Sequence, residues 1–322
     1  MILTRRTLLA TAGATTLAAP FVVPFAARPA HAEGTVVRMG ALKLIHSITP
    51  YFYEKFVPAG MTIEVIPFES PTECKNAVVT KSVEFGTFGI AAGILGAAVR
   101  EPIVIVASAC NRGMAVVVKK YGDIQKLTDL KGKRVAIWPG STQEVFILER
   151  LRMDGMSIRD IQPVRVSFSE MHAALARNDV DAYVGAEPGP GVSIAAGIGR
   201  VLEYPYSTPM GSLNMVLGTH ADTVQSNPAL VRAMVNVQRQ ASEYAMSHRD
   251  EMVAMTVQKL GQKKEAIEIS APNVELNWRM SPEMVAQTRT YAEHMLSLKQ
   301  IKQLPDFATF LNTSFSDAVA TA

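Results

Sequence analysis

The chain has 322 residues, of which 48% are apolar and 19% are charged, and it contains only two cysteines. This composition excludes a disordered chain, a collagen-like chain and a disulfide-held scaffold, and the length suffices for about two domains with a large core. The formal net charge of +3 first suggests an acidic partner, so the position of the positive side chains matters.

The first 32 residues have the three parts of an export signal. Thr4-Arg5-Arg6-Thr7 precedes an apolar run from Leu8 to Ala19, and Ala30-His31-Ala32 offers the small residues after which a signal peptidase cleaves. We predict cleavage after Ala32. The paired arginines resemble the twin-arginine (Tat) signal, but they also occur in ordinary secretory signals, so both export routes stay open. A retained membrane anchor is the alternative to cleavage, and the prolines and the Ala-x-Ala site argue against it.

The excess positive charge belongs to this leader. It holds Arg5, Arg6 and Arg28 and no acidic residue, so the remaining basic residues equal the 29 acidic ones. Nucleic-acid binding thereby loses its main support. After the leader, the apolar run Ile90–Val99 reaches only about half of the roughly 20 residues that a membrane span needs. The sequence predicts a soluble protein in a bacterial periplasm, without a nucleic-acid partner.

The rest of the chain alternates apolar runs typical of strands with amphipathic runs typical of helices. The first series has expected strands at 36–42, 61–68, 85–88 and 103–107, and expected helices at 46–57, from Pro71 after the cap Ser70, and up to Val99. The second has strands at 115–119, 135–138, 164–167, 182–184 and 201–204, with a helical turn at 127–134, helices at 143–153 and 169–178, and a Gly- and Pro-rich stretch at 187–199. A strand at 212–218 returns to the first domain, and helices follow at 228–247, 250–260, 264–270 and 282–298. Such alternation is the signature of mostly parallel sheets covered by helices.

The two cysteines, Cys74 and Cys110, lie in apolar surroundings. An oxidising compartment permits a disulfide between them, but we favour two separate buried thiols. Two cysteines without neighbouring histidines do not make a metal site. We therefore expect neither a metal nor a cofactor.

Several stretches carry a family resemblance. They are Glu84-Phe85-Gly86-Thr87, the run from Leu127 to Thr142 (LTDLKGKRVAIWPGST), the run from Ala174 to Ala182 (ALARNDVDA) and Glu187-Pro188. In this order and spacing they resemble the periplasmic solute-binding proteins of ABC importers, in the nitrate/sulfonate/taurine branch that also includes pyrimidine-precursor binders. The resemblance covers nearly all of Gly34–Ala322.

The resemblance implies an α/β, two-lobed periplasmic binding protein fold of the type II kind. Each lobe is expected to be a mostly parallel sheet flanked by helices, and two crossovers form a hinge. Lobe 1 is placed at 33–111 plus 217–322, and lobe 2 at 112–216. A small-molecule ligand would lie in the cleft between them, and a membrane permease of an ABC importer would be the partner of a monomeric protein.

In open α/β sheets, ligands bind beyond the carboxyl ends of strands, where loops enter helices. This rule selects Gly140, Ser141 and Thr142, because a helix start with free amides and two hydroxyls suits a carboxylate, sulfonate or phosphate. The alternative is that Ser141 or Thr142 only caps its own helix.

The same rule selects the turns after two strands of the first series. His46 either donates to an anion or stacks on a ring, and the alternative is that His46 or Ser47 only caps the next helix. Gly89 would bring backbone donors near the ligand. Phe88 would wall the pocket, or else belong to the core.

Two charged candidates complete the expected site. Arg112, at the crossover, would form a forked pair with an anion, or else be a solvated hinge residue or a salt-bridge partner. Glu187, followed by Pro188, would bind an ammonium, amidine or ring N–H, or else pair with a protein arginine such as Arg112. An anion site at one end and Glu187 at the other would suit a zwitterion, an amine-bearing sulfonate or a nitrogen heterocycle.

Two other functions compete with transport. One is a ligand-binding partner of a membrane sensor kinase, which the sequence does not separate from an importer component. The other is an enzyme on the same fold, such as a pyrimidine-precursor synthase. The chain lacks a G-x-S-x-G elbow, a P-loop and an H-E-x-x-H motif, so we expect a binder without catalytic residues.

Overall fold

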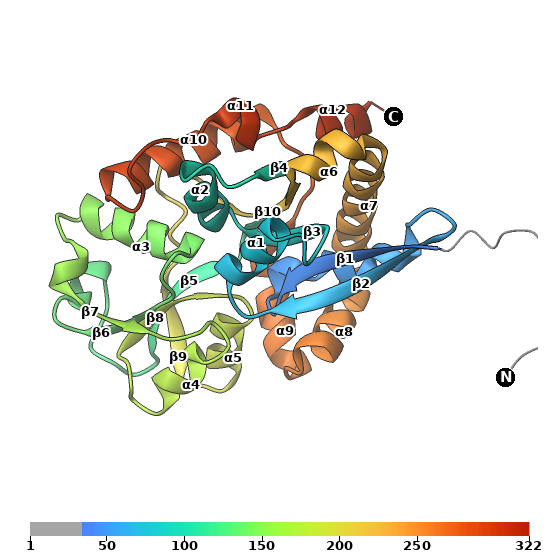
Figure 1. Cartoon of the computed structure of the whole chain (residues 1–322). Coiled ribbons are helices and arrows are strands. Elements are labelled where there is room, and N and C mark those ends of the chain that lie inside the picture. Colours follow the sequence, from blue (N-terminus) through green and yellow to red (C-terminus); the bar gives the residue numbers. More distant parts are fainter. Residues whose placement is uncertain (1–33, 322) are drawn as a thin grey trace, which may run out of the picture. The chain divides into compact units, whose positions relative to one another are not determined.

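The computed structural model describes residues 34–321, so the predicted leader at 1–32 lies outside the described residues. The described chain forms two β-sheets with helices packed on them (Figure 1). The six-stranded sheet has the order β11-β4-β10-β3-β1-β2, and the five-stranded sheet has the order β7-β6-β8-β5-β9.

The elements have the following bounds. The strands are β1 (Thr35–Leu42), β2 (Met61–Phe68), β3 (Phe85–Gly89), β4 (Ile103–Arg112), β5 (Met114–Lys119), β6 (Arg134–Ile137), β7 (Gln162–Arg165), β8 (Ala182–Ala186), β9 (Gly199–Glu203), β10 (Leu213–His220) and β11 (Val274–Leu276). The α-helices are α1 (Pro71–Val79), α2 (Ile90–Ala98), α3 (Thr142–Met153), α4 (Met171–Ala176), α5 (Gly189–Ala195), α6 (Ala221–Ser226), α7 (Pro228–Ser247), α8 (Arg249–Leu260), α9 (Lys264–Ser270), α10 (Pro282–Ser297), α11 (Phe307–Phe310) and α12 (Ser314–Ala320). The 3-10 helices are η1 (Ile45–Ser47), η2 (Thr49–Lys55), η3 (Leu127–Leu130), η4 (Ile158–Asp160) and η5 (Ala271–Asn273).

The two sheets define two lobes. We call the six-stranded sheet and the helices packed on it the first lobe, and the five-stranded sheet with α3, α4 and α5 the second lobe, which is drawn in green to yellow in Figure 1. The chain crosses between the lobes at Gly113 and again before β10. This confirms the predicted α/β class with two crossovers. The predicted lobe boundaries fall at the end of β4 and within β10, and the lobe limits stay a prediction.

Both sheets are mixed, but most strands of each sheet run in the same direction, as expected: β1, β2, β3 and β4 in the first lobe, and β6, β7, β8 and β9 in the second. In the first lobe β1 is parallel to β2 and β3, but β10 is antiparallel to β3 and β4. In the second lobe β6 is parallel to β7 and β8, but β5 is antiparallel to β8 and β9. The strands β5 and β10 each follow a crossover. A strand that starts at the hinge side of a sheet is antiparallel to the neighbouring strands that end at that side.

Most expected helices and strands are present, and α7 and α9 have the expected bounds. The helix expected at 46–57 is instead the pair η1 and η2. Pro50 has no amide hydrogen for a regular α-helical bond, and the tighter turns bury both Phe52 and Tyr53. The Gly- and Pro-rich stretch contains the short helix α5, which tolerates Pro190 because it lies in the first turn.

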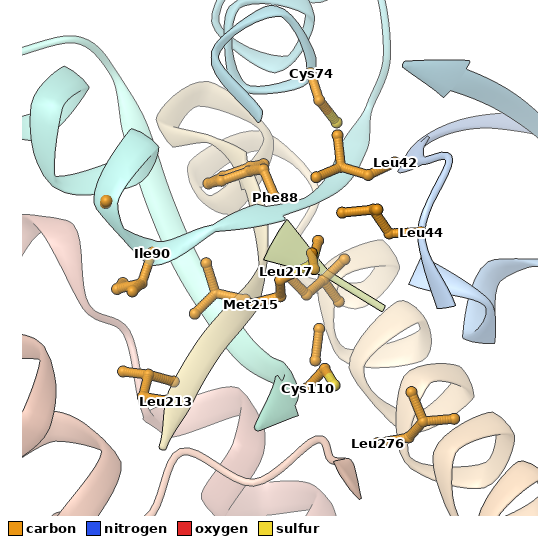
Figure 2. Close-up of a cluster of buried hydrophobic side chains, with 14 of the residues drawn as sticks. Leu42, Leu44, Cys74, Phe88, Ile90, Cys110, Leu213, Met215, Leu217 and Leu276 are labelled. Carbon is orange, nitrogen blue, oxygen red and sulfur yellow. The ribbon is translucent and has the colours of Figure 1, made fainter. Parts of the chain in front are cut away.

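The core of the first lobe surrounds its central strands. Figure 2 shows Phe88, Met215 and Leu217 in a buried apolar cluster that also holds both cysteines, which lie well apart. Cys74 and Cys110 are both free and buried, which confirms two separate thiols. Burial raises the pKa of each thiol well above its usual value, so both stay neutral.

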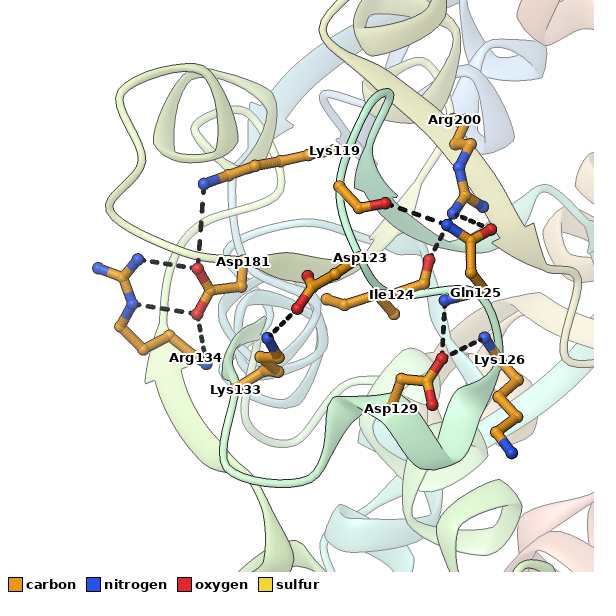
Figure 3. Close-up of polar contacts among 11 residues, drawn as sticks. Lys119, Asp123, Ile124, Gln125, Lys126, Asp129, Lys133, Arg134, Asp181 and Arg200 are labelled. Carbon is orange, nitrogen blue, oxygen red and sulfur yellow. Dashed lines mark hydrogen bonds and ion pairs between the residues drawn. The ribbon is translucent and has the colours of Figure 1, made fainter.

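Polar contacts hold the LTDLKGKR stretch of the family resemblance in place within the second lobe (Figure 3). The Asp129 carboxylate accepts hydrogen bonds from the amides of Gln125 and Lys126, at 2.8 and 3.0 Å, and so caps the N-terminal end of η3. Arg134 makes a forked contact with Asp181 at the start of β8, with distances of 3.2 and 2.9 Å to the two carboxylate oxygens. These residues therefore join β6 to β8.

Candidate ligand-binding site

At the first crossover, the predicted residues Arg112 and His46 lie beside Asn214, which was not predicted. The Arg112 carbonyl accepts from Asn214 Nδ2 at 2.7 Å, and it lies 3.2 Å from His46 Nε2. Arg112 and Gly113 both have positive φ angles, of 62° and 74°. A Cβ atom at Gly113 would overlap the His46 ring, so this turn requires glycine for both its conformation and its space.

The His46 ring is fully buried at this turn. Its Nδ1 has no hydrogen-bond partner within residues 34–321, and burial lowers the pKa of His46 to about 4, so the ring is neutral at pH 7. The Ser47 hydroxyl is also buried and accepts from Thr87 Oγ1 at 2.9 Å. Neither side chain caps η1 or η2, so the alternative of a simple cap does not hold for them.

The polar groups of Gly140, Ser141 and Thr142 at the start of α3 form hydrogen bonds within the protein. Ser141 Oγ accepts from the Glu144 amide at 3.2 Å, which is the capping alternative. The Gly140 amide donates to Glu144 Oε2 at 2.8 Å, and Thr142 Oγ1 donates to the Asn214 carbonyl at 3.3 Å. Burial raises the pKa of the Glu144 carboxyl above its usual value. This loop therefore contacts the first lobe through Thr142, and Glu144 makes a second distant contact because its Oε2 accepts from Gln300 Nε2 at 3.0 Å.

The turn after β3 meets the start of α3. A Cβ atom at Gly89 would lie 2.6 Å from Thr142 Oγ1, so these two predicted residues of different lobes touch. Phe88 is fully buried in the first-lobe core, where its ring lies against Gly218 and Gly93. The core alternative therefore describes Phe88, and Gly89 provides the close approach.

Glu187 ties the end of β8 to the first lobe. Its carboxylate accepts from Ser270 Oγ at 2.8 Å and from Asn273 Nδ2 at 2.8 Å, and also from the Gly191 amide at 3.0 Å. The side chain is 1% exposed. Burial raises the pKa of Glu187, and the donors of Asn273, Gly191 and Ser270 oppose that rise.

The predicted pairing of Glu187 with Arg112 is absent from the described chain, because three uncharged donors surround the carboxylate instead. The Arg112 side chain is exposed, and its guanidinium lies 6.0 Å from the Tyr206 ring. Glu187 joins the crossover through its backbone, since its amide donates to the Gly113 carbonyl at 2.8 Å and its carbonyl accepts from the Ile45 amide at 3.3 Å. The Glu187–Pro188 peptide is cis, and Pro188 is buried.

The predicted residues therefore meet in one region, where a chain of contacts runs from Thr142 through Asn214 and Arg112 to His46. Asn214, Ser270 and Asn273 belong to this region and were not predicted. The position of Asn214 in the expected returning strand is a usable signal, because that strand starts beside the hinge. Ser270 and Asn273 stand in a helical stretch without a motif, so the sequence offers no sign of them.

The contact between Gly89 and Thr142 gives a first prediction. Gly89→Ala should lower the thermal unfolding midpoint, because the new methyl group overlaps Thr142 Oγ1. In the double variant Gly89→Ala/Thr142→Ala the overlapping hydroxyl is gone, so the added cost of the methyl group should largely disappear. Calorimetry of both single variants and the double variant measures this coupling. Additive effects would contradict the direct contact.

Within residues 34–321, no group of three or more His, Cys, Asp or Glu side chains is arranged to hold a metal ion. No helix in the same range has the length and apolar character needed to cross a bilayer. A hollow of about 570 Å³ lies beside the start of β4, and its lining includes Arg100, Gln303 and Phe310. None of the predicted site residues lines it.

Several known proteins resemble this chain in sequence or in fold. A taurine-binding periplasmic protein of Escherichia coli is 31% identical over 147 residues, which are 45% of this chain and 44% of that protein. A second E. coli protein, named for the binding of aliphatic sulfonates, is 24% identical over 225 residues, 69% of either chain. Among solved structures, the alkanesulfonate-binding protein SsuA from Xanthomonas axonopodis pv. citri, bound to MOPS, superposes with a TM-score of 0.78. It is 19% identical, and the match covers 87% of this chain and 99% of that one.

The fold also occurs in an enzyme. The desulfurization enzyme DSZB matches with a TM-score of 0.68 at 15% identity, over 89% of this chain and 99% of its own. The fold by itself therefore does not separate a binder from a catalyst. The sequence model of the NMT1/THI5-like family matches residues 51–252, which is well over half of the chain and spans both crossovers. The predicted resemblance is thus confirmed, and the chain belongs to the NMT1/THI5-like family.

Proposed function

We propose that this protein is the extracytoplasmic solute-binding component of an ABC importer, and that it captures a small organic anion or zwitterion of the sulfonate class between its lobes. The observation that carries the proposal is the contact chain from Thr142 to His46, which joins both lobes at the crossovers. A ligand that touches both lobes favours their closed arrangement. The sulfonate- and taurine-binding relatives support this ligand class.

Binding is proposed instead of catalysis for a chemical reason. A nucleophilic cysteine needs an accessible thiol with a low pKa, whereas Cys74 and Cys110 are buried and their pKa values are raised. Delivery to a membrane permease, and residence in the periplasm after cleavage following Ala32, belong to the same proposal. The periplasmic relatives support that compartment, and export by the Tat route stays a prediction from Arg5 and Arg6.

The site narrows the choice within this ligand class. Three protein donors already surround the Glu187 carboxylate, so an ammonium group would have to compete with them. We therefore expect sulfonates without an amine to bind at least as tightly as taurine. Of the two roles that the sequence leaves open for Glu187, this expectation disfavours the binding of a cationic ligand group.

Isothermal titration calorimetry on residues 33–322 tests the proposal. We expect ethanesulfonate and butanesulfonate to bind with micromolar or tighter dissociation constants, and nitrate to bind at least tenfold more weakly. Tighter binding of taurine than of ethanesulfonate would return Glu187 to the role of ammonium partner. Failure of every organic sulfonate and carboxylate to bind would overturn the proposed function.

A further inference from the structure

A second group of interlobe contacts lies along helix α3 of the second lobe, which packs against α10 of the first lobe. The Phe146 ring meets the Tyr291 ring edge-on, with ring centroids 5.4 Å apart, and Glu144 Oε2 accepts from Gln300 Nε2 at 3.0 Å. The Tyr291 hydroxyl also donates to the Leu213 carbonyl at the second crossover, at 2.9 Å. These contacts join the lobes through a pair of helices outside the contact chain described above.

An ion cluster crosses this pair of helices. The Glu149 side chain of α3 is only 1% exposed, and its two oxygens accept from the Arg152 guanidinium at 2.7 and 2.8 Å. His294 of α10 approaches the same carboxylate from the first lobe, with its Nδ1 3.1 Å from Glu149 Oε2. The His294 side chain is 17% exposed, so the ring exchanges protons with solvent. We call Glu149, Arg152 and His294 the interlobe ion cluster.

The charges that face a neutral His294 do not balance. Arg152 and the exposed Glu293 line a hollow of about 350 Å³ together with His294, and Glu149 lies against the ring from α3. Two carboxylates and one cation therefore surround the imidazole. A proton on His294 balances these charges and adds an attraction between α10 and α3, hence between the lobes.

The other elements around α10 leave this balance unchanged. Helix α2 packs on α10 and carries no titratable side chain, and β10 meets α10 at Leu213, at the strand end opposite to His220. On α3, Arg150 is paired with Glu203 within the second lobe.

The carboxylate of the cluster stays charged at mildly acidic pH. The forked contact with Arg152 holds the pKa of Glu149 below its usual value, with a smaller contribution from His294 and against the effect of burial. Histidine is the residue type whose charge changes between about pH 5 and pH 8. The charge of the cluster therefore changes through His294.

We propose that the interlobe ion cluster is a pH-dependent contact that favours the closed arrangement of the lobes when His294 is protonated. The attraction across α3 and α10 is lost when the lobes part, so acid shifts the equilibrium toward closure. The inference rests on the proposed function for its effect on ligand affinity, because the closed arrangement holds the ligand. Glu149 and His294 are positioning residues, since neither has to touch the ligand.

Spin labels on residues 33–322 test the contact without any ligand. Tyr121→Cys in the second lobe and Val36→Cys in the first place labels at exposed positions, whereas the native cysteines are buried. Double electron–electron resonance then measures the interlobe distance. We expect the ratio of closed to open distances to be about fivefold higher at about pH 5.5 than at about pH 8.

Two substitutions of the histidine separate its charge from its packing. His294→Gln does not gain a proton, so it should give the low wild-type ratio of pH 8 at both pH values. His294→Lys is positive at both pH values, so it should give the high ratio of pH 5.5 at both. Loss of closure in both variants would mean that the imidazole matters only for its shape. The control His248→Gln changes an exposed histidine at the end of α7 and should keep the wild-type pH dependence.

Calorimetry with ethanesulfonate measures the consequence for binding. The apparent affinity follows the closed fraction, so the dissociation constant of the wild-type protein should fall about fivefold more than that of His294→Gln between pH 8 and pH 5.5. Because the coupling is reciprocal, ligand binding should also take up protons at about pH 6.5, and more in the wild-type protein than in His294→Gln.

The outcomes separate the two proposals. A wild-type distance ratio independent of pH, or a pH dependence that His294→Gln retains, would overturn the inference and leave the proposed function intact. Failure of every organic sulfonate to bind would overturn the proposed function, and the spin-label distances alone would then decide whether the contact depends on pH. Thermal melts of each variant at both pH values show whether a changed distance reflects lost folding.

Discussion

Glu187→Ala should lower the free energy of unfolding by about 3 kcal/mol, because it removes a buried acceptor shared by three donors. Ser270 and Asn273 keep the carbonyls of Ala266 and Ile269 as second acceptors, which limits the loss. The Gly191 amide loses the carboxylate, and the shortened side chain leaves unfilled space. Urea unfolding followed by circular dichroism at pH 7 measures the change.

Glu187→Gln separates the loss of acceptors from the loss of charge. The glutamine oxygen still accepts a hydrogen bond from one of the donors, so we expect the free energy of unfolding to fall by less than about 1.5 kcal/mol. The exposed Glu170 of the second lobe is the matched control, and Glu170→Ala should change stability by no more than about 0.5 kcal/mol. Equal losses for Glu187→Ala and Glu170→Ala would mean that Glu187 is solvated in solution and that the lobes are apart at this contact.

The pH dependence of Glu187 has a definite sign. Burial raises the pKa of this carboxyl above its usual value of 4.5, so the folded protein holds the proton more tightly than the unfolded chain does. Its contribution to the free energy of unfolding is therefore full below pH 4.5 and is lost as the pH rises through the raised pKa. The Ser270 hydroxyl lies 2.8 Å from both Glu187 Oε2 and the Ala266 carbonyl, and one hydrogen serves only one of them. A proton on Glu187 satisfies both contacts, and Glu187→Gln should remove this part of the pH profile.

The sequence predicts the local elements well for a physical reason. Asn227 and Pro228 start α7, and Ser70 and Pro71 start α1, because caps and prolines act within one turn of the helix. The direction of β10 depends instead on where the chain enters the first lobe, which no local pattern encodes. The same limit explains why periodicity finds the strands and their mostly parallel arrangement but does not identify β5 and β10 as the reversed strands.

The candidate site was likewise predictable only in part: residues at strand ends could be selected from the sequence, but their distant partners could not. Residues that follow strands could be selected by the rule for α/β sheets, and Thr142, His46 and Glu187 do lie where the lobes meet. Their partners could not be selected, because Ser270 and Glu187 are 83 residues apart and no motif marks the serine. The role of Glu187 follows from those partners. A buried carboxylate at a strand end suggests a cationic ligand until its protein donors are known.

The wild-type protein should lose about 3 kcal/mol of its stability between pH 6.5 and pH 4 through His46 alone. Burial lowers the pKa of this histidine from 6.5 to about 4. The unfolded chain takes up the proton below pH 6.5, whereas the folded protein does so only near pH 4. The contribution of His46 is therefore present above pH 6.5 and is lost as the pH falls to about 4.

His46→Gln isolates this effect. The glutamine amide can still donate to the Arg112 carbonyl beside Gly113, but it does not titrate. Glu187 and Glu144, whose pKa values are raised, contribute a slope of the opposite sign in the same acid range. The informative quantity is therefore the difference in unfolding free energy between wild type and variant, measured by urea unfolding from pH 7 to pH 4.

That difference should be about 3 kcal/mol larger at pH 7 than at pH 4. A difference independent of pH would show that water reaches the imidazole in solution, because only a solvated His46 titrates alike in both states. Since His46 is enclosed by the Arg112–Gly113 crossover, that result would place the free protein in an arrangement where this turn has moved away. Adding a bound alkanesulfonate should then restore the pH-dependent difference, because a ligand held by both lobes encloses the ring again.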